Sequence, residues 1–237
     1  MLPPFSAVIP CFNEAARIGD TVRSTLDYLS AESSEAELIV VNDGSTDATP
    51  TIVREALSGA RIQTRLLENF PNRGKGAAVR SGLLAATKPI GLFFDADLST
   101  PLSEIPKVIK PIASGDVDLA FGSRALDRRL IGVRQSWRRE QAGRVFNLIV
   151  RLATGMPFWD TQCGFKAFRL DVCRPILEQA HTIGFAFDVE LLFLSHRAGL
   201  RLREIPVRWN HAEGSKVRVI HDSLRMLREV IALRISS

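Results

Sequence analysis

The sequence predicts an α/β fold in which helices flank a mostly parallel central sheet, the kind of sheet that binds nucleotides. Two observations lead to this prediction. Short apolar runs alternate with amphipathic helical patterns at least four times along the 237 residues. Polar and acidic residues also follow several of the apolar runs, where the carboxyl ends of parallel strands form a ligand-binding crevice.

Each apolar run is bounded by polar or turn residues, as buried strands are. The expected strands are residues 6–10, 37–42, 62–67, 90–94 and 117–121. Helical spacing of apolar residues predicts helices over 14–29, 77–86, 103–113, 138–153 and 188–197. The remaining expected elements are a turn-rich segment at 160–164, a strand within 201–209 and an amphipathic helix from about residue 220 to the C-terminus.

One domain covering residues 1–237 is the expected organisation, because the chain contains no repeat and no linker rich in Pro, Gly or Ser. Strand and helix alternate regularly over about 1–122, which we interpret as a nucleotide-binding half. Residues from about 123 to 237 are less regular, and we interpret them as an acceptor half built onto the first.

An excess of basic residues gives the chain a formal net charge of +5, which favours anionic partners such as nucleotides, lipid phosphates and acidic membranes. The basic residues are dispersed and match no nucleic-acid-binding motif, so nucleic acid is not an expected partner. Three cysteines without metal spacing indicate reduced thiols in a cytoplasmic protein. No window is apolar enough to span a bilayer, so we expect any membrane contact to be peripheral, at the cytoplasmic face.

Asp95 and Asp97 follow the apolar run 90–94. Two carboxylates at a strand end are suited to a divalent cation that bridges a diphosphate, and Mg²⁺ or Mn²⁺ would neutralise the leaving nucleotide. The alternative is a solvated Asx turn, because Asp is common where strands end. The motifs that precede this pair favour the metal interpretation.

Two of these motifs, VIPCFNE (8–14) and NDGSTD (42–47), each join the end of a strand to the start of a helix. Asp43 is suited to accept an N–H group from a uracil or guanine edge, while Phe12 can pack against the base and Glu14 can meet nearby polar groups. The alternative is helix capping, for which Asn, Asp, Ser and Thr are preferred. We expect capping and nucleoside binding to coexist there.

Gly74-Lys75-Gly76 precedes the predicted helix 77–86, so its backbone amides and the Lys75 side chain are candidates for a phosphate contact. The segment is not a Walker A loop, because Asn69 stands where that loop has Gly, and Gly76 stands where it has Ser or Thr. A helix start that uses glycine for backbone reasons is the other interpretation, and both remain open.

The order of these motifs resembles family 2 glycosyltransferases, in which an apolar strand ending in Pro-X-Tyr-Asn-Glu precedes Asp-Asp-Gly-Ser and then Asp-X-Asp. Further segments are similar to dolichyl-phosphate β-glucosyltransferases within that family, and the resemblance extends from about residue 7 to residue 233. These segments are NRGKG (72–76), GSR (122–124), DTQCGFK (160–166), FDVE (187–190) and EGSK (213–216). Asn42 departs from the Asp usual in the family, and residues 98–100 (LST) depart from the Gly-Ala-Thr of eukaryotic members.

The resemblance implies a GT-A fold and an inverting enzyme that moves glucose from UDP-glucose onto a polyprenyl phosphate of the dolichyl type, with Mg²⁺ or Mn²⁺ as cofactor. The alternatives are transfer of mannose from GDP-mannose or of a sugar from another donor, and a non-catalytic nucleotide-sugar-binding module. The metal is assigned to Asp95 and Asp97. The donor-binding residues that the resemblance implies are Pro10, Phe12, Asn13, Glu14, Asn42, Asp43, Lys75, Asp95 and Ala96.

The resemblance also implies that Arg124 and Arg138 hold the acceptor phosphate, which the forked donors of Arg suit. Gln162 and Lys166 complete the implied acceptor site. A lipid phosphate arrives largely ionised and needs no general base, so Asp188 is expected to organise Lys166 or the arginines, with helix capping as the alternative. The expected catalytic residues are Asp95, Asp97, Arg124, Arg138 and Asp188.

Two segments are candidates for peripheral membrane contact. The C-terminal stretch places Ile220, Leu224, Leu227 and Ile231 at helical spacing among arginines at positions 218, 225, 228 and 234. The predicted helix 138–153 offers Phe146, Ile149 and Val150 beside Arg144 and Arg151. For either segment the alternative is that its apolar face covers the core of the protein itself.

Overall fold

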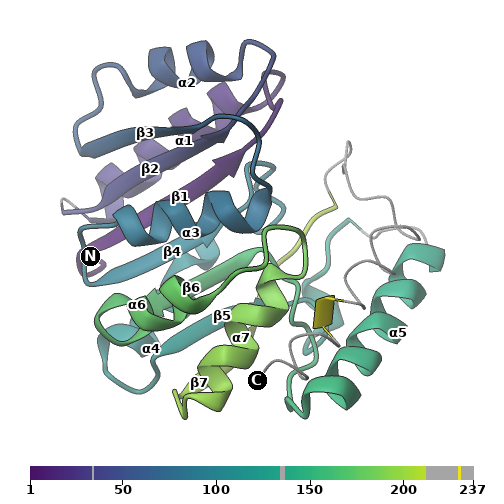
Figure 1. Cartoon of the computed structure of the whole chain (residues 1–237). Helices are drawn as coiled ribbons and strands as arrows, with labels where there is room; N and C mark the ends of the chain where they lie inside the picture. The colour runs from purple at the N-terminus through teal and green to yellow at the C-terminus, as the bar shows by residue number, and fades with distance from the viewer. Residues whose placement is uncertain (34, 134–136, 212–228, 231–237) are drawn as a thin grey trace.

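A computed structural model of the chain describes residues 1–33, 35–133, 137–211 and 229–230, and the side chains of 138 and 139 lie outside this description. Its seven strands form one sheet in the order β3-β2-β1-β4-β6-β5-β7 (Figure 1). The strands are β1 (Phe5–Cys11), β2 (Glu37–Asp43), β3 (Gln63–Asn69), β4 (Ile90–Phe94), β5 (Leu119–Ser123), β6 (Phe165–Arg169) and β7 (Leu202–Pro206). All neighbouring strands are parallel except that β6 runs antiparallel to both β4 and β5.

Helices cover both faces of the sheet. They are α1 (Ile18–Glu32), α2 (Thr49–Leu57), α3 (Lys75–Ala85), α4 (Ile105–Ala113), α5 (Trp137–Thr154), α6 (Leu170–Gln179) and α7 (Phe187–Arg197), with short 3-10 turns η1 (Leu102–Glu104) and η2 (Arg128–Leu130). Buried side chains of α1, α2 and α4 belong to one apolar cluster, and those of α3, α5, α6 and α7 belong to a second.

The two clusters arise from the alternation of side chains along each strand. In β1, for example, Ala7 and Ile9 belong to the cluster under α1, whereas Val8 between them belongs to the cluster under α3. Because both faces are covered, the central strands consist almost entirely of apolar residues. This is the pattern from which the sequence predicted buried parallel strands.

The predicted mostly parallel sheet flanked by helices is confirmed, and it contains one strand and two α-helices for which no range had been expected. The expected strand at 117–121 is β5, shifted toward the C-terminus by two residues, and the expected strand within 201–209 is β7. The elements for which no range had been expected are β6, α2 and α6, and in β6 the charged residues Lys166 and Arg169 interrupt the apolar pattern. The C-terminal helix expected from residue 220 lies outside the described residues, apart from 229 and 230.

The antiparallel direction of β6 decides how the candidate site is built. Parallel strands β1, β2 and β4 deliver the residues that follow them to one edge of the sheet. Because β6 runs the other way, the residues that precede it reach the same edge, and Phe165 pairs with Phe94 in the register of β4 and β6. The loop 160–164 is thereby placed beside Asp95.

Candidate active site

The acidic pair stands in the turn that follows β4. Asp97 accepts a hydrogen bond from the N–H group of Ser99 at 2.9 Å through Oδ1, and the Thr21 hydroxyl donates to the carbonyl oxygen of Ala96 at 2.7 Å. Leu98 has a positive φ of 48°, which lets the chain reverse directly after the pair. The Asx turn considered as an alternative is therefore present, and it coexists with an exposed Asp97 and a half-buried Asp95.

Lys75 lies against this acidic pair at the first position of α3. Its Nζ atom is 2.7 Å from Oδ1 of Asp95. Burial alone would lower the pKa of Lys75, but the carboxylates of Asp95 and Asp188 outweigh burial and hold this pKa above its ordinary value. Asp97 acts in the same direction. The carboxylates of Asp95, Asp97 and Asp188 thus act on one ammonium group, that of Lys75, which stays protonated.

Gly164 lies directly against Asp95 of the acidic pair. A Cβ atom at this position would overlap the Asp95 carboxylate and lie 2.7 Å from its Cγ. Only glycine leaves room for the carboxylate to approach the backbone of the loop that precedes β6. The contact therefore requires glycine at the last position of the DTQCG segment.

The glycine-containing segment before α3 does not present its amides to a ligand. The N–H group of Gly74 donates to Oδ2 of Asp43 at 2.7 Å, and the N–H group of Gly76 donates to the carbonyl oxygen of Ile183 at 2.9 Å. Protein acceptors therefore use these two amides, and of the two interpretations left open the backbone role of glycine holds for them. Gly74, at a φ of 96°, serves the backbone turn, and the Lys75 side chain remains the candidate for a phosphate contact.

Asp43 ends β2 and is almost fully buried. Its Oδ1 atom accepts hydrogen bonds from Asn69 Nδ2 at 2.9 Å and from the N–H group of Arg73 at 3.1 Å, in addition to the bond from Gly74. Asn42 accepts a bond from the N–H group of Ser45 at 3.2 Å. Both residues therefore shape the loops that border the expected donor crevice.

The loop after β1 is tied to the loop after β2. The N–H group of Asn13 donates to the Ser45 hydroxyl at 2.9 Å, while Oδ1 of Asn13 accepts from the N–H group of Thr46 at 2.8 Å. The N–H group of Glu14 donates to the Thr49 hydroxyl at 2.8 Å. These bonds join the two loops to each other and are not made by N-cap residues, since Arg17 of α1 and Ala48 of α2 form no side-chain capping bond. The two other expected donor residues of this strand end are Pro10, buried within β1, and Phe12, half-buried after it.

Lys166 and Asp188 form a buried ion pair between the donor and acceptor sides. Lys166 Nζ lies 2.5 Å from Oδ1 of Asp188 and donates to the carbonyl oxygen of Cys163 at 2.6 Å. Burial raises the pKa of Asp188, and the cations Lys166 and Lys75 offset this only in part. Lys166 is fully buried, which places its ammonium behind the site surface and not at it.

Arg124 follows β5 and is held by Asp160. The guanidinium donates from Nε to Oδ2 at 2.7 Å and from Nη2 to Oδ1 at 2.8 Å, while the Arg124 N–H group adds a third bond to Oδ2. Burial disfavours both charges, yet the pair keeps the pKa of Asp160 below and that of Arg124 above its ordinary value. This bidentate geometry fixes the direction of the remaining guanidinium edge.

Glu204 of β7 supports this pair, and the sequence analysis missed it. Its Oε1 atom accepts from the N–H group of Asp160 at 2.7 Å and from the Ser123 hydroxyl at 2.6 Å. Its Oε2 atom accepts from the N–H group of Trp159 at 2.9 Å. In the sequence, Asp160 was noticed only as part of the DTQCGFK motif. No pattern around Glu204 indicated which residues it would contact.

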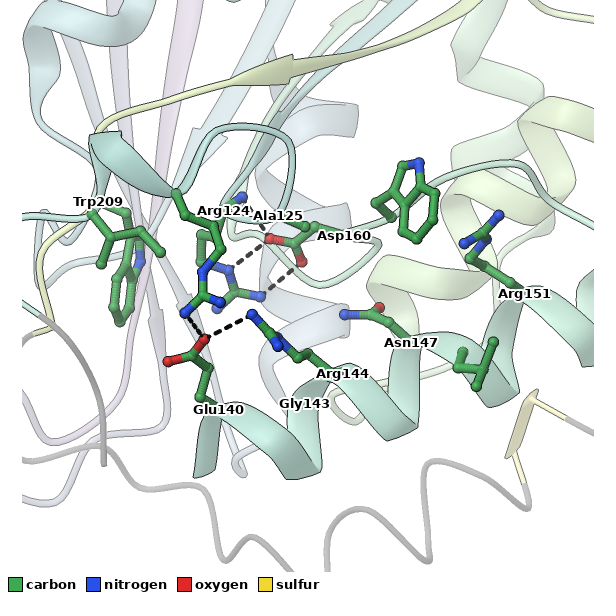
Figure 2. A pocket seen from close by; sticks show the side chains of 13 residues that line it. Arg124, Ala125, Glu140, Gly143, Arg144, Asn147, Arg151, Asp160 and Trp209 are labelled. Carbon is green, nitrogen blue, oxygen red and sulfur yellow. Dashed lines mark hydrogen bonds and ion pairs between the residues drawn. The ribbon is translucent and has the colours of Figure 1, made fainter. Parts of the chain in front are cut away.

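A cavity of about 510 Å³ opens beside Arg124, between η2 and α5 (Figure 2). Four arginines and two carboxylates line it, together with two indole rings. The lining residues are Arg124, Ala125, Arg128, Ile131, Glu140, Gly143, Arg144, Asn147, Leu148, Arg151, Trp159, Asp160 and Trp209. Its basic, aromatic and aliphatic character fits an anionic group attached to an apolar chain.

The other expected acceptor residues take different places. Gln162 is half-buried, and its N–H group donates to Oδ1 of Asp160 at 3.3 Å. Arg138 lies in the first turn of α5, but its side chain is outside the described part of the structure. Arg128 and Arg144, which had not been assigned to the acceptor site, line the cavity and both pair with Glu140.

A divalent cation fits the acidic pair through a combined ligand set. Among the described residues no group of three or more His, Cys, Asp and Glu side chains forms a metal site within the protein. Mg²⁺ and similar ions are commonly held by one or two carboxylates together with the phosphates of a substrate. Asp95 and Asp97 match the protein share of such a site.

The sheet order and the acidic strand end together define a GT-A glycosyltransferase fold. A solved structure of glucosyl-3-phosphoglycerate synthase from Mycobacterium tuberculosis, in complex with Mn²⁺, uridine-diphosphate-glucose and phosphoglyceric acid, has this fold. It matches with a TM-score of 0.69 and 23% identity, over 98% of this chain and 79% of that chain.

The chain belongs to glycosyl transferase family 2, whose sequence profile matches residues 6–177. It is 34% identical to dolichyl-phosphate beta-glucosyltransferase of Saccharomyces cerevisiae, over 98% of this chain and 74% of that protein. It is 36% identical to dolichyl-phosphate beta-glucosyltransferase of Drosophila melanogaster, over 96% of this chain and 73% of that protein. The expected resemblance and enzyme class are confirmed.

Within the described residues, no helix has the length and apolar character that crossing a membrane requires.

Proposed function

We propose that this glycosyltransferase moves glucose from UDP-glucose to the phosphate of a polyprenyl phosphate, with inversion at the anomeric carbon. The observation that carries the proposal is that one loop, 160–164, joins two differently built sites. Gly164 lies against Asp95 of the acidic pair, and Asp160 holds Arg124 beside the basic cavity. The names of the similar glucosyltransferases and the UDP-glucose bound by the structural neighbour support the choice of donor and acceptor.

On the donor side, Asp95 and Asp97 are the residues that would hold Mg²⁺ or Mn²⁺. When bound, the ion supplies positive charge that stabilises the leaving UDP. Lys75, kept protonated by its carboxylate neighbours, provides a second positive charge toward the diphosphate. The loops held by Asn13, Asn42 and Asp43 border the nucleoside.

On the acceptor side, Arg124 positions the lipid phosphate. Its bidentate contact with Asp160 leaves one guanidinium edge directed at the cavity, where Arg128 and Arg144 add positive potential. An ionised phosphate oxygen attacks the anomeric carbon as the bond to UDP breaks, so no proton has to be removed. Catalysis then depends on positioning and charge stabilisation, and the buried Lys166–Asp188 pair keeps the two sides in register. Arg138 is assigned to the same phosphate.

The acceptor is a lipid, so the proposal places the protein at the cytoplasmic face of a membrane as a peripheral enzyme. A screen of UDP-glucose, UDP-galactose and GDP-mannose against polyprenyl phosphate and free polyprenol, each with Mg²⁺, Mn²⁺ and EDTA, tests it. We expect turnover with UDP-glucose and polyprenyl phosphate, abolished by EDTA. Turnover with GDP-mannose as the donor, and with neither UDP-glucose nor UDP-galactose, would refute the donor assignment. Nucleotide binding without transfer to any acceptor would refute the enzymatic proposal.

A further inference from the structure

Helix α5 carries an apolar surface that nothing in the described part of the structure covers. Three of its side chains and the indole of Trp159 are more than half exposed. We call Val145 (57% exposed), Leu148 (54%), Leu152 (73%) and Trp159 (55%) the α5 patch. Several exposed aliphatic residues along one side of a helix are uncommon when the helix only covers a core.

The α5 patch is distinct from the side of the helix that packs on the protein. Phe146 and Val150 are buried in the apolar cluster beneath α5. The expectation that Phe146 and Val150 face a membrane is therefore wrong. At about 100° per residue, Val145, Leu148 and Leu152 share the opposite side. Figure 1 shows α5 at the far side of the molecule from α2 and β3.

Basic residues border the α5 patch where it meets the acceptor cavity. Arg144 and Arg151 flank Leu148 on the side of α5 that also carries Asn147, and all four residues line the cavity. Figure 2 shows Arg144, Asn147 and Arg151 along this helix. The Arg151 guanidinium lies 3.9 Å from the centre of the Trp159 ring, which holds the ring beside the helix. An apolar strip bordered by arginines and an indole suits the interface of an anionic bilayer.

We infer that the α5 patch docks this enzyme on the surface of an anionic phospholipid bilayer, with the mouth of the acceptor cavity facing the lipid. This inference rests on the proposed polyprenyl phosphate acceptor. Leu148 belongs to both the patch and the cavity lining, so an acceptor can pass from the bilayer to Arg124 while its chain stays among apolar groups. A second copy of the chain fits less well, because two-fold contact through this face brings the same arginines toward one another.

The test is co-sedimentation of the full chain with phosphatidylcholine vesicles, with and without phosphatidylglycerol, in the absence of donor and acceptor. We expect binding to the anionic vesicles that weakens with salt, and a loss of about tenfold in the double variant Val145→Glu/Leu152→Glu. The milder variant Val145→Ser/Leu152→Ser should bind with intermediate strength. Phe70→Glu, at a 93% exposed residue after β3, is the matched control and should bind like the unmodified chain.

Equal vesicle binding by Val145→Glu/Leu152→Glu and the unmodified chain, with both folded by circular dichroism, would overturn the inference. An unmodified chain that forms a dimer in sedimentation velocity, ignores the vesicles and becomes monomeric in the double variant would overturn it as well, and would assign the patch to a second copy.

A transfer assay separates failure of this inference from failure of the proposed function. The double variant should keep its rate on a short-chain, water-soluble prenyl phosphate and lose rate on vesicle-embedded polyprenyl phosphate. Patch-dependent vesicle binding without transfer to either acceptor would refute the proposed function while still supporting the docking surface. Loss of rate on both acceptors to the same extent would count against the docking surface.

Discussion

Gly164 and Asp95 are in such close contact that a side chain on residue 164 and the carboxylate of residue 95 exclude each other. Strands β4 and β6 create the contact, because Phe94 and Phe165 are paired in their antiparallel register. Sequence neighbours of two different motifs thereby become neighbours in space, and the contact gives a direct test of the metal site.

Gly164→Ala should weaken Mn²⁺ binding in the presence of UDP by about tenfold, because the new methyl group displaces the Asp95 carboxylate. Electron paramagnetic resonance titration of Mn²⁺ measures this effect. Gly143→Ala is the control, since a Cβ there meets open space. Unchanged Mn²⁺ affinity in Gly164→Ala would show that the position of Asp95 does not matter for the ion.

Asp97→Asn should reduce metal-dependent transfer by at least about a hundredfold with little change in thermal stability, since Asp97 is exposed and its hydrogen bond from the Ser99 N–H group lies within its own turn. Asp95→Asn should be nearly as sensitive. Initial rates with Mg²⁺ and Mn²⁺ provide the measurement, and Asp20→Asn on the exposed side of α1 is the control. Full activity of Asp97→Asn, or of the unmodified chain in excess EDTA, would exclude the proposed metal role.

Arg124→Ala should raise the KM for polyprenyl phosphate by about tenfold to a hundredfold and leave the KM for the donor nearly unchanged. Removing Arg124 also strands the buried Asp160, so thermal unfolding has to be recorded for each variant. Arg124→Lys keeps the charge and should recover the acceptor KM only in part, because Lys lacks the forked donors. Equal effects on both substrates would argue against an acceptor role.

Glu204→Gln should raise the acceptor KM several-fold, less than Arg124→Ala does, because one of the two oxygens that hold the N–H groups of Trp159 and Asp160 becomes an amino group. A residue that only stabilises β7 would not change acceptor and donor constants differently. Steady-state kinetics with each substrate varied distinguishes these roles. Glu55→Gln, at an exposed position of α2, is the control, and its acceptor and donor KM values should match those of the unmodified chain.

Asp118 ties β5 to the start of β7, away from the site, and makes stability depend on pH. Hydrogen bonds from Arg201, together with the charge of Arg169, hold the pKa of Asp118 below its ordinary value. A depressed folded-state pKa adds stability above the unfolded pKa of about 4, and this stability is lost as the pH falls through the folded value.

Asp118→Asn should therefore lower the free energy of unfolding at neutral pH, and its difference from the unmodified chain should shrink in acid. Urea unfolding at neutral pH and below about pH 4 measures both values. Asp27→Asn, at an exposed position of α1, is the control and should show neither effect. A constant difference across this range would mean that Asp118 does not carry the predicted linkage.

Much of the fold follows from local patterns. The apolar runs of β1, β2 and β4 are buried on both faces, so their composition alone identifies central parallel strands. In β6, the charged residues Lys166 and Arg169 interrupt the apolar pattern that identifies β1, β2 and β4. Its antiparallel direction depends on pairing with β4 and β5, which are distant in sequence.

The acidic pair and Lys75 were recognisable as candidates from residue type and position, because strand ends in a parallel sheet converge on one crevice. Arg124 was indicated only by the resemblance to family 2 glycosyltransferases. Hydrogen-bond partners were not recognisable, because they come from other strands and loops. Tertiary structure decided that the amides of Gly74 and Gly76 serve Asp43 and Ile183, and that Glu204 supports Asp160. Sequence determines which groups are available, whereas long-range contacts decide which groups remain open to a ligand, since each buried donor has to find its acceptor within the fold.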